Sequence, residues 1–158
     1  MTSRFPATIL RKLADLFLLF KRPNRRQVAA LVWRRGDGGN IEILLITTRR
    51  SGRWNIPKGW LMADHTAAEA AAQEAWEEAG ARGVVDDTPL GEFTYEKTLS
   101  RGGPAMRMTA TVFALRLTQL ADDFPEAGQR ERAWYTPEDA ANMVRETDLR
   151  TIIRGFAS

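Results

Sequence analysis

Three glutamates, Glu74, Glu77 and Glu78, lie at positions i, i+3 and i+4 of a predicted helix. This spacing places their side chains on one side of the helix, where like charges repel. They also lie near its C-terminal end, where the helix dipole disfavours each anion by roughly 0.3–1 kcal/mol. A divalent cation between the carboxylates compensates this cost, and hard cations such as Mg²⁺ prefer oxygen ligands. The alternative is a solvated acidic face.

The helix that carries these glutamates has sequence signals at both ends. Thr66 is followed three residues later by Glu69, the capping-box pattern in which each side chain binds the other residue's backbone N–H. Residues 67–79 contain no Gly or Pro and consist mainly of Ala and Glu, which are strong helix formers. Gly80 supplies a left-handed stop. We therefore predict a helix over residues 67–79, with a metal site at its last turns.

This stretch resembles the signature of the Nudix hydrolases. The positions that match the signature at the right spacing are Gly59, Glu74, Ala75, Glu77, Glu78, Gly80 and Ala81. Two positions depart from it, because the first family glutamate falls on His65 and the family arginine falls on Gln73. In the family these two side chains form an ion pair that holds the loop against the helix. Since both are replaced, we interpret the change as a coordinated exchange of this contact rather than loss of the metal site.

The resemblance implies an α/β fold, namely a Nudix-type α/β/α sandwich with a mixed β-sheet. It also implies metal-dependent hydrolysis of a diphosphate linkage with Mg²⁺, or Mn²⁺, as the cofactor. Glu74 and Glu78, one helical turn apart, are the candidate ligands of a shared cation, and the Gly59 carbonyl is a further ligand by resemblance. Glu77 is offset and is the candidate general base. The choice of base stays open, since family members differ in which glutamate takes the proton.

The positions of several basic residues resemble those in the family branch that hydrolyses diphosphoinositol and diadenosine polyphosphates. In that branch, phosphates are held by basic residues at the positions that match Arg25, Arg26, Arg49 and Arg130. Lys58 belongs to a Pro-Lys-Gly loop that resembles the dinucleoside polyphosphate hydrolases. Guanidinium groups pair well with phosphate oxygens. We therefore expect a small-molecule polyphosphate or nucleotide substrate, a cytoplasmic location and no stable nucleic-acid partner.

Two other functions are compatible with the same residues. The first is a Nudix-fold module that binds nucleotide, polyphosphate or RNA ends and whose catalysis is weakened by the changes at His65 and Gln73. The second is a hydrolase of RNA ends whose arginines follow the backbone, which predicts strong salt dependence. Metal-dependent phosphate release from diadenosine polyphosphates separates an enzyme from a binding module.

The composition is that of a soluble globular chain. Of the 158 residues, 44% are hydrophobic and 27% are charged, and the net charge is +3. The chain has no cysteine and a single histidine, which excludes disulfides and thiolate metal sites and disfavours a Ser-His-Asp triad. We expect one Nudix hydrolase domain over residues 25–158, preceded by an N-terminal appendage, residues 1–24.

The appendage, residues 1–24, has apolar residues at helical spacing and is predicted to form an amphipathic helix. It is too short to cross a bilayer, and charged residues within its apolar part disfavour a signal peptide. We expect it to pack on the domain, with a homodimer contact or a membrane surface as the alternatives.

The rest of the chain predicts a mixed sheet with the acidic helix on one face and two C-terminal helices on the other. The expected strands are 28–33, 41–48, a short strand that starts at 84–85, then 91–99, 106–117 and 133–135, and residues 54–56 lead into the Pro-Lys-Gly loop. The expected C-terminal helices span about 137–144, with Thr136 as the cap and Pro137 in the first turn, and about 148–156.

Overall fold

The computed structural model describes residues 25–98 and 100–156. The predicted N-terminal helix lies outside the described residues, so that expectation stays a prediction. The strands are β1 (Arg26–Arg35), β2 (Ile41–Thr47), β3 (Trp54–Asn55), β4 (Lys58–Trp60), β5 (Ala81–Thr98), β6 (Ala105–Leu120) and β7 (Arg132–Tyr135). The helices are α2 (Ala67–Ala79), α3 (Pro137–Met143) and α4 (Thr147–Phe156).

The seven strands of the described residues form one mixed sheet, whose main path runs β3-β2-β1-β6-β5. The central pair, β1 and β6, is parallel, with Arg26 opposite Thr109 and Trp33 opposite Arg116. The other pairs are antiparallel, including β4 on β1 and β7 on β2. The predicted mixed sheet is therefore confirmed, and β1 lies at its centre because its apolar run is buried on both faces.

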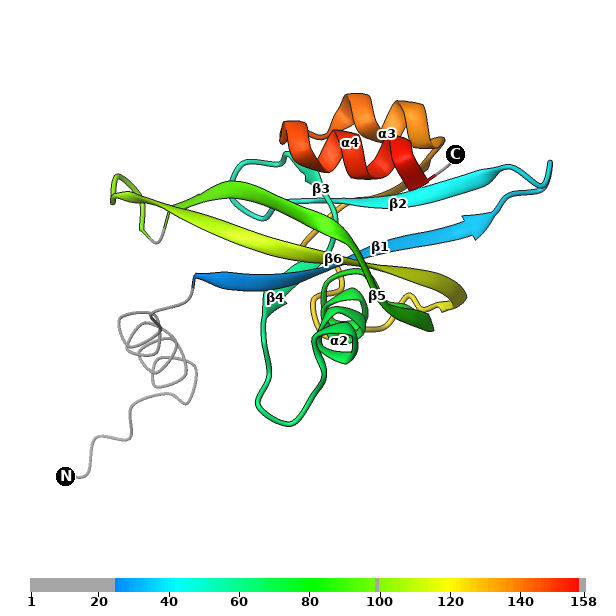
Figure 1. The fold of residues 1–158 in the computed structure, drawn as a ribbon, viewed down its shortest axis with the longest axis horizontal. Coiled ribbons are helices and arrows are strands. Elements are labelled where there is room, and N and C mark those ends of the chain that lie inside the picture. Colours follow the sequence, from blue (N-terminus) through cyan, green and yellow to red (C-terminus); the bar gives the residue numbers. More distant parts are fainter. Residues whose placement is uncertain (1–24, 99, 157–158) are drawn as a thin grey trace.

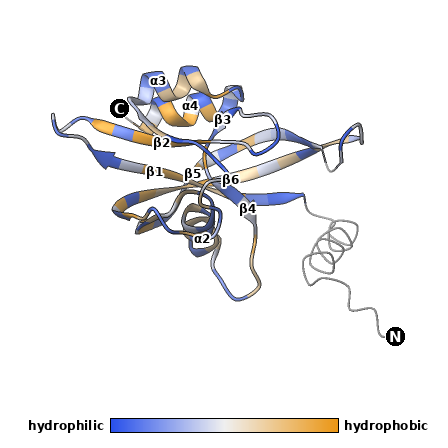
Figure 2. Ribbon diagram, turned by 180° about the vertical axis from the view of Figure 1, so that it is seen from behind, coloured by the Kyte–Doolittle hydropathy of each residue, from blue (hydrophilic) through white to orange (hydrophobic). Residues whose placement is uncertain are grey.

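Helices cover both faces of this sheet, as predicted. In Figure 1, α2 lies on one side of the sheet, and α3 and α4 lie on the other. One core cluster joins α2 to the sheet, and a second joins α3 and α4 to the opposite face. Figure 2 shows apolar residues in β2 and in α4, which lie on the same side of the molecule. Burial on two faces accounts for the alternation of core residues along β1 and β2 between the two clusters.

The helix α2 begins and ends where the sequence predicts. The Thr66 hydroxyl accepts a hydrogen bond from the Glu69 N–H, and the Glu69 carboxylate accepts one from the Thr66 N–H. Gly80 ends the helix in the left-handed conformation with φ of 67°. The buried residues of α2 are all alanines, namely Ala68, Ala70, Ala71, Ala75 and Ala79. Because alanine is small, the helix packs close to the sheet, so the carboxylates in its last turns lie near β4.

The strand β5 differs from the prediction. The sequence predicts two strands, one starting at 84–85 and one over 91–99, whereas the structure has one strand from Ala81 to Thr98, which includes the turn-forming residues Asp86, Asp87 and Pro89. Its ladder with β6 continues past this stretch through register shifts between Val85 and Pro89 and between Pro89 and Gly91. The long partner strand keeps the chain extended where local turn residues favour a break.

No helix within the described ranges is long and apolar enough to cross a membrane.

Candidate active site at the end of the acidic helix

The loop before α2 is held in place as a short strand. β4 pairs with β1, with Gly59 opposite Val28, and the Ala30 N–H donates to the Pro57 carbonyl over 2.9 Å. The Glu74 carboxylate lies directly against Gly59. A Cβ atom at position 59 would overlap the Glu74 carboxylate, so a larger residue there would displace the far end of this side chain. The structure therefore brings Gly59 and Glu74 together, as the sequence predicts.

Both oxygens of Glu78 have partners. Its Oε2 accepts a hydrogen bond of 3.2 Å from the Lys58 N–H, and its Oε1 lies 2.9 Å from Arg130 Nη2. The side chains of Arg130 and Glu78 are only 9% and 13% exposed, which strengthens this ion pair relative to a surface pair. Arg130 also contacts Glu126 at 3.4 Å and donates to the Thr47 carbonyl over 3.1 Å. Arg130 therefore fixes the orientation of Glu78.

Negative charge is concentrated at this end of α2. Burial raises the pKa of Glu74 from 4.5 to about 8, with further contributions from the carboxylates of Glu78, Glu77 and Glu126. Burial also raises the pKa of Glu78, whereas the neighbouring Arg130 and Lys58 oppose this rise. Full ionisation of both groups thus requires more positive charge than the neighbouring side chains supply.

These residues fit a divalent cation by their chemistry. Glu74 and Glu78 supply carboxylate oxygens in a partly dry site with excess negative charge, which are the conditions that a hard cation satisfies. Among residues 25–98 and 100–156, no three His, Cys, Asp or Glu side chains are grouped closely enough to form a complete metal site. The assignment of Glu74, Glu78 and Gly59 as metal ligands therefore stays a prediction.

Glu77 has a different environment from the other two glutamates. Its Oε1 accepts a hydrogen bond of 2.9 Å from Gln73 Nε2, and its carbonyl accepts one of 3.0 Å from the Glu126 N–H. In the described part of the chain, Gln73 is not hydrogen-bonded to His65, whose N–H donates to the Met62 carbonyl. Gln73 instead contacts the glutamate one turn further along the same helix, and the interpretation of the two changes as a coordinated exchange that keeps the metal site stays a prediction.

The predicted phosphate-binding residues divide into two groups. Arg49, Lys58 and Arg130 share acidic neighbours, since Arg49 contacts Glu126 at 3.1 Å and Arg130 contacts the same carboxylate. Lys58 lies near Glu78 and places its Nζ 4.8 Å from the centre of the Tyr95 ring. Burial lowers the pKa of Lys58.

Arg25 and Arg26 form the second group, at the start of β1. Both are exposed, and Arg26 Nη1 lies 3.2 Å from Glu92 on β5. The Arg25 carbonyl accepts a hydrogen bond from the Thr109 N–H. Over residues 25–98 and 100–156, no hydrogen bond or ion pair joins Arg25 or Arg26 to the three glutamates of α2, so their role in substrate binding stays a prediction.

Sequence reasoning missed two charged residues at this site. Glu126 links Arg49, Arg130 and the end of α2, and Lys97 on β5 lies over the Trp60 ring at 5.4 Å. Glu126 stands four residues before Arg130, but this spacing predicts an ion pair only within a helix, and residues 126–130 form turns and bends. Lys97 is a lone basic residue in a strand, so its position near the glutamates depends on the tertiary fold.

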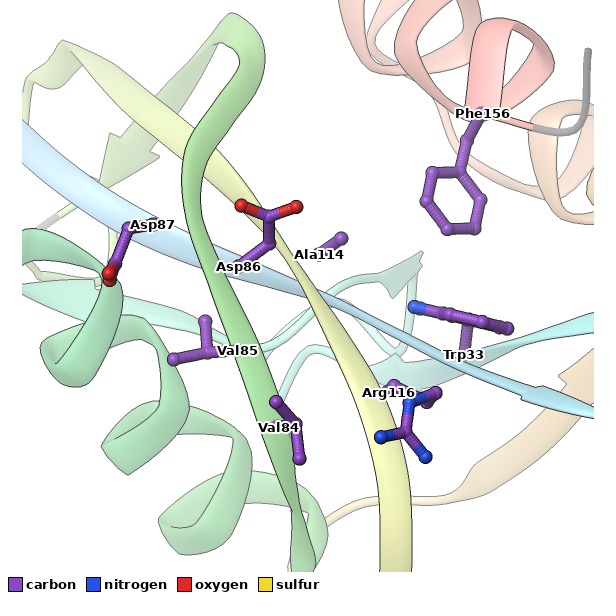
Figure 3. Close-up of a pocket in the computed structure, with 8 residues that line it drawn as sticks. All are labelled: Trp33, Val84, Val85, Asp86, Asp87, Ala114, Arg116 and Phe156. Carbon is purple, nitrogen blue, oxygen red and sulfur yellow. The ribbon is translucent and has the colours of Figure 1, made fainter.

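A separate hollow of about 510 Å³ lies away from this cluster. It is lined on one side by Trp33 and Phe156, whose rings meet edge to face with centroids 5.6 Å apart, and it also includes Arg116 and Asp86 (Figure 3). It contains none of the residues that the sequence predicts for catalysis, metal binding or substrate binding. The candidate active site is therefore the charged cluster at the end of α2 and not this hollow.

The fold and the site define a class of protein, an α/β/α sandwich in which a glutamate-rich helix end meets a cationic loop and strand. Comparison with known proteins agrees with this class, since the NUDIX domain profile matches residues 23–156. This chain belongs to the Nudix family, which confirms the resemblance seen in the sequence.

Two relatives and one solved structure illustrate the similarity. The chain is 34% identical to mitochondrial Nudix hydrolase 12 of Arabidopsis thaliana, over 73% of this chain and 58% of the relative. It is 31% identical to diphosphoinositol polyphosphate phosphohydrolase 3-alpha of Mus musculus, over 66% of this chain and 60% of the relative. The chain thus spans less than two thirds of the length of these relatives. The crystal structure of the C. elegans Ap4A hydrolase has a similar fold, with a TM-score of 0.57 at 20% identity, covering 83% of this chain and 94% of that structure.

Proposed function

We propose that this chain hydrolyses a diphosphate linkage in a nucleoside-diphosphate-type or polyphosphate small molecule, with Mg²⁺ or Mn²⁺ held by Glu74 and Glu78. The observation that supports this most directly is the packing of the Glu74 carboxylate on Gly59, beside a Glu78 already oriented by Arg130 and Lys58. A phosphoanhydride joins two anionic groups, so its hydrolysis requires charge neutralisation and a positioned water. The site offers acidic and basic groups in close proximity for both purposes.

Each residue has a distinct role in this proposal. When bound, a divalent cation polarises phosphoryl oxygens and acidifies a water molecule. Arg130 and the Lys58 N–H keep Glu78 in one orientation, and Gly59 leaves room for Glu74. Glu77 is offset and takes the proton from water as general base, with Gln73 orienting its carboxylate. Arg49 and the Lys58 ammonium contact phosphate oxygens of the substrate.

A diadenosine or diphosphoinositol polyphosphate is the substrate that we propose. The names of a mouse relative and of a structural neighbour, a diphosphoinositol polyphosphate phosphohydrolase and an Ap4A hydrolase, support this class. The grouping of Arg49, Lys58 and Arg130 also supports it, since several cations suit a substrate with several phosphates.

A module that binds polyphosphate with weakened catalysis is the second candidate. The observation that favours it is that both Glu78 oxygens are already engaged by protein donors, which compete with a cation. Phosphate release from diadenosine polyphosphates in the presence of Mg²⁺ supports the enzyme, and tight binding without release supports the module.

The Glu78→Gln variant tests the enzyme. We expect its fold to be retained because Glu126 still pairs with Arg130, and we expect nearly all turnover to be lost because the amide is a poor ligand for a hard cation. Turnover is measured with a panel of nucleoside, dinucleoside and inositol pyrophosphates in Mg²⁺ and in Mn²⁺. The exposed Glu131 provides the control, and Glu131→Gln should match the wild type. Unchanged turnover of Glu78→Gln would end the assignment.

A further inference from the structure

Lys97 is a basic residue that the roles proposed above do not use. It lies near the end of β5, opposite Met106 in the ladder with β6. Since side chains alternate along a strand, Phe93, Tyr95 and Lys97 lie on one face of β5. Phe93 is fully buried in the core beneath α3 and α4, and Tyr95 packs against the same core. Lys97 therefore continues a row of packed side chains and is not part of the solvated face.

The ammonium of Lys97 is held at the acidic helix by an aromatic platform. Its Nζ lies 5.4 Å from the centre of the Trp60 ring, and Trp60 follows Gly59 directly in β4. A cation over an indole face is attracted by the ring quadrupole. Trp60 thus brings a positive charge from β5 to the loop that also carries Gly59.

The surroundings of this ammonium contain charges of both signs. Burial lowers the pKa of Lys97, Glu78 and Glu74 oppose the effect, and Arg49 and Arg50 add to it. Arg50 Nη1 donates to the Thr98 carbonyl over 3.0 Å, so the loop that carries both arginines contacts the end of β5. Lys97 is therefore within electrostatic range of both the glutamates of α2 and the arginine loop.

Lys97 differs from the arginines of the site in its pairing. Arg49 contacts Glu126, and Arg130 contacts Glu78 and Glu126. Over residues 25–98 and 100–156, by contrast, Lys97 forms no ion pair with a carboxylate. A half-buried ammonium without an anionic partner is unfavourable, and an anionic ligand removes this cost.

We propose that Lys97, positioned by Trp60, binds a phosphoryl group adjacent to the one held at Glu74 and Glu78. Of the two substrate classes proposed above, it thus selects dinucleoside polyphosphates, with three or more consecutive phosphates, over diphosphoinositol polyphosphates, which have two. The inference deepens the proposed function and depends on its site. It makes β5, together with the Arg49–Arg50 loop, the part of the site that recognises chain length. A single phosphate reaches only one of these cationic groups, whereas a longer polyphosphate reaches several.

The test compares Lys97→Met with Lys97→Arg in the full-length protein. Calorimetry with Mg²⁺ measures binding of inorganic tripolyphosphate and of inorganic phosphate, and steady-state kinetics measure hydrolysis of a polyphosphate substrate. We expect Lys97→Met to weaken tripolyphosphate binding and raise KM about tenfold, equivalent to about 1.4 kcal/mol, with kcat nearly unchanged. Phosphate binding should change little, and Lys97→Arg should restore binding because it keeps the charge.

Arg107 offers a matched control on the same hairpin. It pairs with Glu96, one position before Lys97, so its side chain lies on the opposite face of the β5–β6 ladder. Arg107→Met removes the same unit of charge and should bind tripolyphosphate as the wild type does. An equal loss in Arg107→Met and Lys97→Met would mean that overall charge, and not this position, sets the affinity, which would overturn the proposal.

A second measurement uses the wild-type protein in case Lys97→Met does not fold. The chain has few lysines, namely Lys12, Lys21, Lys58 and Lys97, so their Cε–Hε NMR signals are resolvable. Lys97→Arg, which keeps the charge, identifies the signal of Lys97. Tripolyphosphate should shift this signal to saturation with the affinity found by calorimetry, and an unshifted signal would overturn the proposal.

The outcomes separate this inference from the proposed function. If the wild type hydrolyses polyphosphates while Lys97→Met keeps its KM and its tripolyphosphate affinity, the role of Lys97 is disproved and the hydrolase remains. If the wild type hydrolyses nothing but binds tripolyphosphate through Lys97, the hydrolase is disproved and the binding role remains. If the wild type does not bind tripolyphosphate at all, the role of Lys97 is disproved.

Discussion

Gly59 is where the loop and the acidic helix come into closest contact. Its missing side chain leaves the space that the Glu74 carboxylate occupies, since a Cβ atom there lies 2.0 Å from Oε1. We predict that Gly59→Ala forces this carboxylate to move. Because the atoms that must move are the far end of a flexible side chain, we expect a stability cost of no more than about 1 kcal/mol, the lower end of the range for overpacking. A displaced catalytic group, by contrast, lowers kcat/KM by about 100-fold. Urea unfolding and steady-state kinetics measure the two effects.

Gly155 in α4 provides the control for this substitution. A Cβ atom at Gly155 meets nothing within 4 Å, and alanine is the better helix former. Gly155→Ala should therefore keep full activity and gain slightly in stability. If Gly59→Ala behaves like Gly155→Ala, the packing of Glu74 on the loop does not matter for function.

Glu74 also makes the stability of the metal-free protein depend on pH. Its pKa is about 8 in the folded protein, against an ordinary value of 4.5. Between these values the folded state keeps a proton that the unfolded state has lost, so stability decreases as pH rises through this window. In EDTA, the Glu74→Gln variant should show a smaller decrease because the amide stays neutral, and the raised pKa of Glu78 leaves the remainder. We expect Glu74→Gln to be more stable than the wild type at about pH 9. At about pH 5, where Glu74 of the wild type is also neutral, this advantage should disappear.

Urea unfolding of both proteins at the two pH values measures this difference. Mg²⁺ should restore stability to the wild type at high pH and leave Glu74→Gln unaffected, because a cation replaces the proton on Glu74. The same pH dependence in both proteins would show that another group is responsible.

At the scale of elements, the C-terminal end of α2 is held by Arg132 of β7. Arg132 Nη1 donates to the carbonyls of Ala79 and Ala121 at 2.8 and 2.7 Å, and its guanidinium lies 4.9 Å from the centre of the Phe124 ring. A cation at this helix end also interacts favourably with the helix dipole, whereas the nearby glutamates interact unfavourably with it. We predict that Arg132→Gln costs about 1 to 3 kcal/mol of stability and lowers kcat more than it raises KM, because the last turn of α2 shifts.

Arg82 supplies the comparison for Arg132. Its guanidinium lies 3.7 Å from the centre of the Trp76 ring on the same helix, but Arg82 is exposed. Arg82→Gln should change stability by less than about 1 kcal/mol and leave kcat unchanged. Chemical unfolding measures both losses of stability. A larger loss in Arg82→Gln than in Arg132→Gln contradicts the role of Arg132 in holding the end of α2.

The accuracy of the sequence predictions follows the range of the interactions involved. Both ends of α2 were predictable because the capping box at Thr66 and the left-handed Gly80 are local. The cap of α3 at Thr136, whose hydroxyl accepts from the Asp139 N–H, is local in the same way. β5 was predicted as two strands because its turn-forming residues are local, whereas its pairing with β6 is not.

The residues of the site likewise fall into those set by local spacing and those set by long-range contacts. Glu74, Glu77 and Glu78 were predictable because their spacing on one helix is itself the signal. The Arg130 contact with Glu78 joins residues 52 positions apart, and the Arg49 contact with Gln129 spans 80 positions. The position of Lys97 over Trp60 likewise depends on how β5 and β4 are placed by the sheet. Such contacts follow from tertiary packing, which no local spacing encodes.

At the scale of the whole molecule, the sheet connects two differently built halves. The half around α2 has an alanine-rich core that brings charged groups close to the sheet, and the half around α3 and α4 has larger buried side chains such as Leu149 and Ile153. Asn55 Nδ2 donates to Glu146 Oε2 over 3.3 Å and so joins the loop of the site to the segment before α4. The core around α3 and α4 is thus linked, through Asn55 and Glu146, to the segment that leads into the Pro-Lys-Gly loop.

Removal of residues 1–24 tests whether the appendage is part of this architecture. Both core clusters and the candidate active site are built within residues 25–156, so we predict that the truncated protein keeps the kcat/KM of the full chain. If the appendage packs on the domain as expected, its removal lowers Tm by about 2 to 4 °C for each kcal/mol of packing lost. An unchanged Tm with flotation of only the full chain on anionic liposomes would indicate a membrane contact instead. A halved mass on truncation, measured by light scattering, would indicate a homodimer contact.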